Sequence, residues 1–341
     1  MKELVQAVEA DVASLRQELT LGPTLEELIS RINASDKFLR QQQVSRSKRM
    51  SYVHGIVSIY GLLEQHVGAV LMETASAFEA ICTRYSQVPE RLLAAHREFT
   101  LRALLDSDRV RLVEPLSESS AMAVLASSLS EQPVRLNKSV FTYSTANYRH
   151  SQVVDLFRRL DVNAQDCKAA PGVTAAIRRE GLVFRDADAL LLNLAERRNE
   201  IAHSYRVSDL LDAGVMTAYL VVVEQYLNAL IYAASQRLLH ELARQELVKI
   251  GTVVNTWTTA FGVDMTAGQI QSPCHILLLK DGRADTLHVS SLQSEGNTID
   301  GRIEYSSETI QLGVGFQVPV LANWRNADVF VLPERWLYLK A

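Results

Sequence analysis

Apolar residues recur at helical spacing from residue 1 to about residue 249, and the pattern breaks where proline, glycine and serine gather. A first amphipathic helix is expected over roughly residues 2–20. A second helix is expected to begin at Pro23, with Thr24 as a candidate cap. A long helix over residues 47–85 carries one apolar stripe, which consists of Val53, Ile56, Val57, Tyr60, Leu63, Val67 and Val70.

The helical pattern weakens between about residues 106 and 147, where SDRVRLVEPLSESS and SEQPVRLNKSVFTYSTAN are typical of loops. It resumes over residues 148–160, pauses at NAQDCKAAPGV, and returns in two segments that end near residues 205 and 248. Residues 1–249 are therefore expected to form one α-helical domain.

A different pattern begins at residue 250. From there to residue 341, short β-branched or alternating runs such as HILLLKDG and DTLHVSSL are separated by Asp-Gly and Glu-Gly pairs. Many short strands at even spacing favour a closed barrel, because closure hides the sheet edges. The predicted fold class is α+β, with an N-terminal helical bundle followed by a small C-terminal β-barrel over residues 250–341.

Composition narrows the class of protein. The chain is 48% hydrophobic and 22% charged, and its net charge of −4 argues against indiscriminate binding of nucleic acid while leaving room for a local basic site. Its three cysteines show no C-x-x-C spacing, which favours reduced thiols in the cytoplasm and gives no reason to expect a metal or a cofactor. The N-terminus does not resemble a signal peptide, and the apolar run over residues 213–234 carries Glu224 and Gln225, so we expect a buried helix and no membrane span.

A polar group interrupts the apolar pattern in the stretch LAERRNEIAHSYRV, residues 194–207. On a helix, positions five apart diverge by about 140° and positions four apart by only about 40°. Asn199 and His203 therefore share a face, and Asn199 can orient the His203 ring. Arg198 needs either a local break in the helix or a second polypeptide to approach the same target as His203, and a twofold dimer supplies a second copy.

An arginine fork matches a phosphate, and a histidine titrates near neutral pH. His203 can take the proton from a ribose 2′-hydroxyl while Arg198 stabilises charge on the attacked phosphate. This chemistry cleaves RNA without a metal and leaves a 2′,3′-cyclic phosphate and a 5′-hydroxyl. Asn199 completes the candidate catalytic set.

The spacing of arginine and histidine is not specific by itself, because it recurs from Arg49 to His54 and from Arg91 to His96. In the third copy a polar residue follows the arginine, Ala202 precedes the histidine, and the motif lies between two long expected helices.

That context resembles the HEPN superfamily, whose signature is an arginine, usually followed by Asn, Asp or His, with four to six residues between the arginine and a histidine. The long helix beginning KRMSYVHGIVSIYGLLEQHV is also similar to the opening helix of HEPN-like nucleases of bacterial defence and toxin systems. The resemblance covers roughly residues 40–245, with residues 106–147 as an insertion. It implies an up-and-down helical bundle, a homodimer and metal-independent endoribonuclease activity, although some members of the superfamily are binding or assembly modules.

The roles of two further sets of residues remain open. The sequence RNEIAHSY also matches HEPN toxins whose tyrosine, here Tyr205, is nucleotidylated by a partner enzyme; the alternative is a tyrosine that packs at the helix end. The candidate RNA-binding residues are Arg197, Arg46, Lys48 and Arg49, which expose basic groups beside the motif or before the long helix. Basic residues of this kind more often lie on solvated helix faces and bind no RNA.

The C-terminal region resembles the β-barrel of the second domain of translational GTPases. The similar features are the initial strand with Ile250, Gly251 and Val253, the VSSLQSEG segment, the GVGFQV run and the final ADVFVL. The resemblance implies docking of RNA, a ribosomal surface or a partner protein, and the alternative is an appendage that supports stability or dimerisation.

These observations predict a cytoplasmic, homodimeric endoribonuclease that acts on RNA as a toxin or antiphage effector, alongside an antitoxin, a nucleotidyltransferase or a defence-system partner. The rival hypothesis is a non-catalytic HEPN assembly protein whose barrel recruits a partner.

Overall fold

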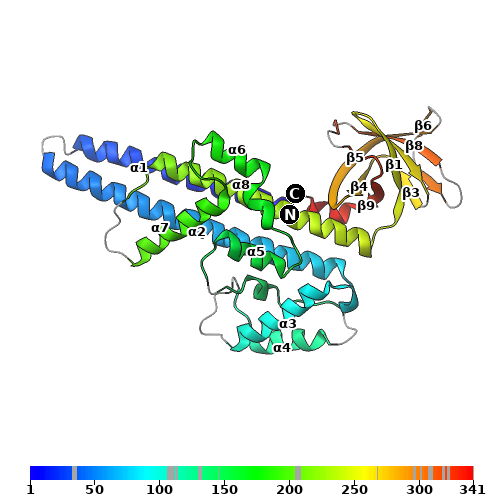
Figure 1. The fold of residues 1–341 in the computed structure, drawn as a ribbon, viewed down its shortest axis with the longest axis horizontal. Coiled ribbons are helices and arrows are strands. Elements are labelled where there is room, and N and C mark those ends of the chain that lie inside the picture. Colours follow the sequence, from blue (N-terminus) through cyan, green and yellow to red (C-terminus); the bar gives the residue numbers. More distant parts are fainter. Residues whose placement is uncertain are drawn as a thin grey trace. The chain divides into compact units, whose positions relative to one another are not determined.

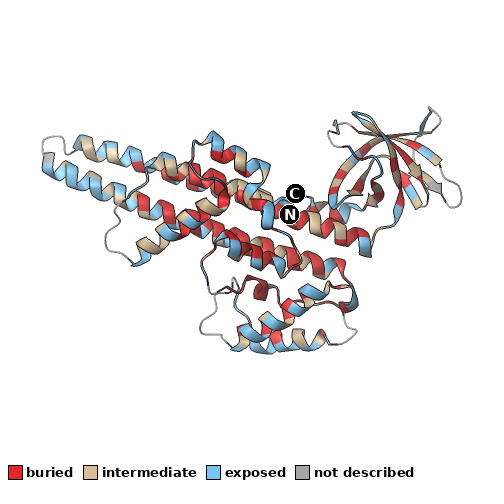
Figure 2. Cartoon of the chain, viewed as in Figure 1, coloured by how far each residue is buried: buried red, intermediate tan, exposed pale blue. Residues whose placement is uncertain are grey.

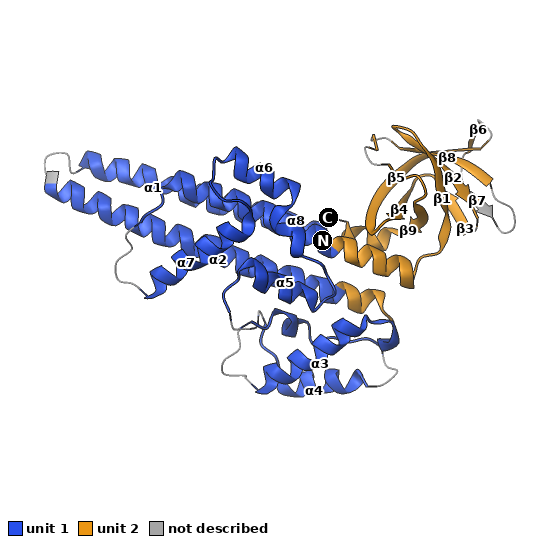
Figure 3. Cartoon of the chain, viewed as in Figure 1, with its two compact units in different colours: residues 1–76, 84–234 blue, residues 77–83, 235–341 orange. Residues whose placement is uncertain are grey.

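The computed structural model describes residues 1–32, 37–105, 112, 114–129, 133–144, 146–203, 209–266, 268–294, 297–299, 302–305, 310–316, 319–320 and 323–340. The chain forms two compact units, one of residues 1–76 and 84–234 and the other of residues 77–83 and 235–341 (Figure 3). The change from helix to strand falls between Gln245 and Lys249, while the division between the units lies inside the preceding helix. The predicted α+β class, with helices first and a barrel after them, is confirmed.

The α-helices account for most of the first 245 residues (Figure 1). In chain order they are α1 (Lys2–Ile32), α2 (Lys37–Ile81), α3 (Glu90–Leu105), α4 (Glu118–Ser127), α5 (His150–Arg158), α6 (Pro171–Arg179), α7 (Ala187–His203) and α8 (Ala213–Gln245). Short 3-10 helices are η1 (Tyr85–Gln87), η2 (Lys138–Thr142), η3 (Gln165–Ala169) and η4 (Glu334–Leu339).

The prediction of two separate helices before residue 32 is wrong. Helix α1 continues through Pro23 from Lys2 to Ile32. Proline removes one N–H and strains one turn, but the buried residues Leu15, Leu19 and Gly22 keep the helix docked through this region. A Cβ atom at Gly22 would lie 2.9 Å from the hydroxyl oxygen of Ser51, so α1 and α2 approach closely at this point.

The starting point of the long helix also differs from the prediction. Helix α2 begins at Lys37, so Arg46, Lys48 and Arg49 lie inside it and do not precede it. Local sequence between residues 37 and 46 lacks a clear apolar stripe, which is why the pattern located the start ten residues late. The expectation of loops over residues 106–147 is incomplete, because α4 and η2 lie there.

The polar residues of this region fold onto α3. The side chain of Asn137 donates hydrogen bonds to the Thr100 hydroxyl (3.2 Å) and the Ala121 carbonyl (3.1 Å). Its backbone N–H donates to His96 Nε2 at 3.0 Å. His96 and Thr100 are buried, so their hydrogen bonds to Asn137 hold this segment against α3. The segment is therefore packed, although its sequence is typical of a polar loop.

Helices α2 and α8 each contain a window long and apolar enough to cross a membrane, and 61% of each window is buried inside the fold. The same test is passed by core helices of soluble proteins, and the burial pattern along both helices is that of core helices (Figure 2). Tyr52, Tyr226 and Phe78 are among the largest fully buried side chains on them.

Six strands close a barrel in the described part of residues 249–332, in the order β4-β9-β1-β2-β8-β5, with β5 pairing back onto β4. The strands are β1 (Lys249–Thr256), β2 (Ala260–Met265), β3 (Gly268–Gln271), β4 (Cys274–Lys280), β5 (Arg283–Ser294), β6 (Asn297–Ile299), β7 (Arg302–Tyr305), β8 (Ile310–Phe316) and β9 (Asp328–Leu332). β6 pairs antiparallel with the end of β5, and β3 pairs with β7. The Asp281-Gly282 pair forms the β4–β5 turn with φ values of 50° and 76°, as a two-residue type I′ turn requires.

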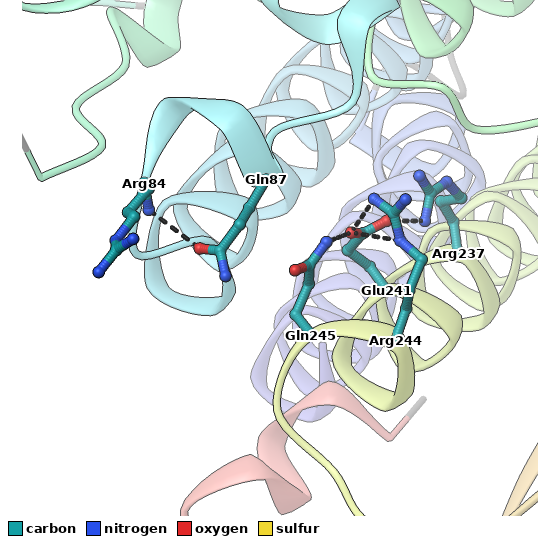
Figure 4. A network of polar contacts seen from close by, with 6 residues as sticks. All are labelled: Arg84, Gln87, Arg237, Glu241, Arg244 and Gln245. Atoms are coloured by element: carbon teal, nitrogen blue, oxygen red, sulfur yellow. Dashed lines mark hydrogen bonds and ion pairs between the residues drawn. The ribbon is translucent and has the colours of Figure 1, made fainter. Parts of the chain in front are cut away.

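The unit that contains the barrel also holds an ion cluster around a buried carboxylate near the end of α8. The Glu241 carboxylate, only 1% exposed, accepts hydrogen bonds from Arg237 (2.8 Å), Arg244 (3.1 Å) and Gln245 (2.7 Å) (Figure 4). Burial alone would raise the pKa of Glu241, but these donors lower it overall. Figure 4 also draws a separate contact in the other unit, where the Arg84 backbone N–H donates to Gln87 Oε1.

Candidate functional site

The motif occupies the last two turns of α7. Leu190, Leu191 and Leu194 are buried on the preceding turns and fix the helix in the bundle. Within the described residues α7 is continuous from Ala187 to His203, so a local helix break does not bring Arg198 and His203 together. Their side chains leave the axis about 140° apart and about 7.5 Å apart along it. The other route considered from the sequence, a second polypeptide, stays a prediction.

Arg198 lies against an aromatic platform on α2. Its Cζ atom is 5.5 Å from the centre of the Tyr60 ring, a distance typical of a cation–π contact. Its Nη1 donates to Asn199 Oδ1 at 3.4 Å. Arg198 is partly buried and is not sealed from solvent.

Asn199 is oriented by a residue far away in the sequence. Its Oδ1 accepts a hydrogen bond from Asn147 Nδ2 at 3.2 Å in addition to the one from Arg198. The sequence analysis assigned Asn199 to the orientation of His203, because the two share a helix face. In the structure the Asn199 oxygen points to Arg198 and Asn147, and the role of Asn199 towards His203 stays a prediction.

The Tyr60 platform is itself held in place. Its hydroxyl accepts a hydrogen bond from the backbone N–H of Tyr148 at 2.8 Å. Burial raises the pKa of Tyr60 to about 12, with Glu64 acting in the same direction, and burial likewise raises the pKa of Tyr148 to about 12. Both phenols are therefore neutral near pH 7, and Tyr60 serves Arg198 through its ring.

Arg159 fixes the segment that carries Asn147 and Tyr148. Its Nη1 donates to the carbonyl oxygens of Phe141 (3.3 Å) and Tyr143 (2.8 Å), and its Cζ lies 3.7 Å from the centre of the Phe99 ring. Burial lowers the pKa of Arg159 to about 10, which still leaves it charged near neutral pH. We assign Arg159 a structural role.

Arg197 differs sharply from its neighbour Arg198. The Arg197 side chain is 13% exposed and donates to Asn193 (2.8 Å), to the Tyr52 hydroxyl (3.1 Å), and to the carbonyl and carboxylate of Asp209 (2.9 and 3.0 Å). Burial opposes its charge, but the bonds to Tyr52 and Asp209 raise its pKa above the ordinary value. Arg197 therefore joins α7, α2 and the chain before α8, and we remove it from the RNA-binding set.

The remaining predicted residues lie at the surface. His203 is exposed in the last described turn of α7, and Tyr205 lies outside the described residues. Arg46 and Lys48 are exposed on α2, and Lys48 pairs with Glu26 at 3.9 Å. Arg49 on the same helix is half-exposed.

The sequence analysis did not identify Asn147 or Tyr148, and it treated Tyr60 only as a core residue. The signal available was the polar and aromatic stretch TYSTANYRH next to a helix start, which is too common in loops to single out a site.

Metal-binding and cysteine chemistry are not favoured in the part of the chain that the structure describes. No group of three or more His, Cys, Asp or Glu residues there could hold a metal ion. Burial raises the pKa of the Cys82 and Cys167 thiols to about 12 and that of Cys274 to about 11, so all three are neutral.

Comparison with protein families identifies the helical part. The family model RiboL-PSP-HEPN matches residues 24–236, which is more than half of the chain, so the protein belongs to this HEPN family. The HEPN resemblance of the sequence is thereby confirmed. Comparisons with curated proteins and with solved structures gave no match.

Proposed function

We propose that this protein is a HEPN-type endoribonuclease that cleaves RNA without a metal ion. The observation that carries the proposal is the pair of a positioned Arg198 and an exposed His203 on the last turns of one helix. Membership of a HEPN family supports it, because HEPN domains are commonly ribonucleases.

The proposed reaction assigns each group one task. His203 accepts the proton of a ribose 2′-hydroxyl, and the 2′-oxygen then attacks the adjacent phosphorus. Arg198 stabilises the negative charge that grows on the phosphate oxygens. The bond from phosphorus to the 5′-oxygen breaks and that oxygen takes up a proton, which leaves a 2′,3′-cyclic phosphate and a 5′-hydroxyl.

In this mechanism Asn147 and Asn199 are positioning residues. They hold Arg198 over the Tyr60 ring and need not touch the substrate. Because Arg198 and His203 of one copy diverge, the proposed site draws one group from each of two copies, which makes the active form a homodimer.

A cleavage assay tests the proposal. Purified protein is incubated with RNA in excess chelator, alongside Arg198→Ala, His203→Ala and the control Arg91→Ala. Arg91 begins another arginine and histidine pair of the same spacing, on α3, and is 63% exposed. We expect parent and Arg91→Ala to cleave alike and the other two variants to lose about 100-fold or more. Equal cleavage by all four would contradict the proposal.

The wider role we propose is that of a cytoplasmic toxin or antiphage effector, controlled by an antitoxin, a nucleotidyltransferase or a defence-system protein. Expression of the parent should arrest growth, and His203→Ala should relieve the arrest.

The alternative is a non-catalytic assembly protein, favoured by the large apolar side chains exposed on α1 and α2. This alternative predicts that RNA stays intact when it is incubated with a stoichiometric amount of the protein. It also predicts that a pulldown recovers a defined partner protein.

A further inference from the structure

Arg149 is a cation close to the motif that the proposed reaction does not use. It directly follows Asn147 and Tyr148, it is exposed, and its side chain makes no capping hydrogen bond to α5. In the part of the chain that the structure describes, its guanidinium has no ion-pair partner. Arg158, at the other end of α5, pairs with Asp155 at 2.7 Å. Arg149 thus presents a charge that no described contact accounts for.

The backbone places Arg149 on the same side of the chain as Asn147. The Arg149 N–H donates to the Asn147 carbonyl at 2.9 Å, so the chain turns sharply at Tyr148. Tyr148 and His150 are buried. Asn147 is partly buried and Arg149 is exposed. This alternation is that of an extended segment, in which every second side chain points to the same side, and Asn147 and Arg149 therefore share the outer side.

Asn147 ties this outer side to the motif helix. Its Nδ2 donates to Asn199 Oδ1, the atom that also accepts from Arg198. Cα atoms two residues apart are separated by at most about 7 Å, so the long side chain of Arg149 starts close to this pair of amides. The inner side of the turn is held as well, because the backbone N–H of the intervening tyrosine donates to the Tyr60 hydroxyl at 2.8 Å. Arg149 is therefore mounted on a fixed part of the site.

The charges around the motif favour a second cation in the site. Burial is the larger cause of the raised pKa of Tyr60 and Tyr148, and the negative charge of Glu64 raises both further. Glu200 lies on α7 two residues after Arg198. A phosphate held by Arg198 alone would meet these carboxylates as well as the net charge of −4 of the whole chain. A second arginine offsets that repulsion, and its fork matches the oxygens of a phosphate.

We propose that Arg149 binds a backbone phosphate of the RNA strand next to the phosphate that Arg198 contacts. Its task is to hold the substrate, while the reacting atoms stay with Arg198 and His203. The inference rests on the proposed function, since it takes RNA as the ligand of this site.

A binding measurement tests the inference without cleavage. The probe is a short fluorescent RNA with methylated 2′-hydroxyls, which 2′-oxygen attack cannot cleave, and its anisotropy gives the Kd at a series of salt concentrations. Arg149→Ala should raise the Kd about tenfold. It should also reduce the slope of log K against log salt by about 0.7, the value for one phosphate on a single strand. Arg149→Lys keeps the charge and should keep most of the slope.

Arg158→Ala is the matched control, because it removes an exposed arginine from the far end of α5. It should leave the Kd within about twofold of the parent value and the slope unchanged. A parental Kd and slope in Arg149→Ala would overturn the inference. Equal losses in Arg149→Ala and Arg158→Ala would overturn it too, because they would indicate attraction by overall charge, and so would a parent protein that does not bind the probe.

Steady-state cleavage separates this inference from the proposed function. With a cleavable oligonucleotide, Arg149→Ala should raise KM about tenfold and keep kcat within about twofold, whereas Arg198→Ala should lower kcat. A lower kcat with an unchanged KM in Arg149→Ala would contradict a role in binding. If the parent binds the probe but leaves RNA intact, the proposed ribonuclease fails, and the Kd and salt slope of Arg149→Ala decide by themselves on Arg149.

Discussion

Asn147 and Asn199, fifty-two residues apart, are joined by a hydrogen bond of 3.2 Å from Asn147 Nδ2 to Asn199 Oδ1. The same Asn199 oxygen accepts from Arg198, so a residue in a connecting segment sets the direction of the arginine in the motif. The candidate site is therefore a product of two distant parts of the helical unit.

The first prediction concerns this chain of contacts. Asn199→Asp keeps an acceptor for both donors and should retain cleavage within about twofold, whereas Asn199→Leu and Asn147→Ala should lower kcat about tenfold, the equivalent of one lost hydrogen bond. Steady-state cleavage of a short oligoribonucleotide measures the effect. If Asn199→Leu cleaved like the parent, the positioning role would be wrong.

The second prediction separates two adjacent arginines by stability. Arg197→Met leaves Tyr52, Asn193 and Asp209 without their shared donor and should reduce the free energy of unfolding by roughly 2–4 kcal/mol. Arg198→Met loses one long hydrogen bond and a partly exposed ring contact, and should cost less than about 1 kcal/mol. Denaturant unfolding followed at 222 nm compares them, and similar losses would contradict the assignment of Arg197 as structural.

The third prediction is a pH dependence that originates at His96. Burial lowers the pKa of His96 to about 4 from an ordinary 6.5, with Arg97 acting in the same direction. The folded state binds this proton less readily than the unfolded state does. The contribution of neutral His96 to the free energy of unfolding is therefore complete above pH 6.5 and is lost as the pH falls from 6.5 towards 4. Between pH 7.5 and 4.5 the loss from this group should be about 2.5 kcal/mol.

His96→Gln provides the comparison, since the glutamine oxygen can still accept the Asn137 N–H. Its unfolding free energy should fall less than that of the parent over the same pH interval. Parallel pH profiles for the two proteins would exclude His96 as the source.

The fourth prediction addresses the Glu241 cluster. Glu241→Ala removes the shared acceptor of Arg237, Arg244 and Gln245 and should destabilise the barrel-containing unit by about 3 kcal/mol, because the largely buried Arg237 loses its carboxylate partner. Glu27→Ala breaks an exposed pair with Arg31 on α1 and should change stability by less than about 0.5 kcal/mol. Thermal unfolding would reveal the difference, and equal melting curves for the two variants would argue against a structural role for the cluster.

Several features of the fold could be predicted because they are local. Periodicity located the long apolar helices and the change to strands near residue 249, and the Asp281-Gly282 pair identified a tight hairpin turn. Helix boundaries were less predictable. Pro23 lies inside α1, and α2 starts at Lys37, because packing of one helix against the other stabilises turns that local propensity leaves undecided.

The candidate site, like the fold, could be predicted only in part from the sequence. The order of residues on α7 determined by itself that Arg198 and His203 diverge while Asn199 and His203 share a face, since helix geometry depends only on spacing. Only the tertiary structure decided that Arg197 is tied into the fold, that Arg198 rests on Tyr60, and that Asn199 turns to Asn147. Those choices depend on which side chains from other helices lie within hydrogen-bonding reach, and a linear pattern of hydrophobic and polar residues does not encode that proximity.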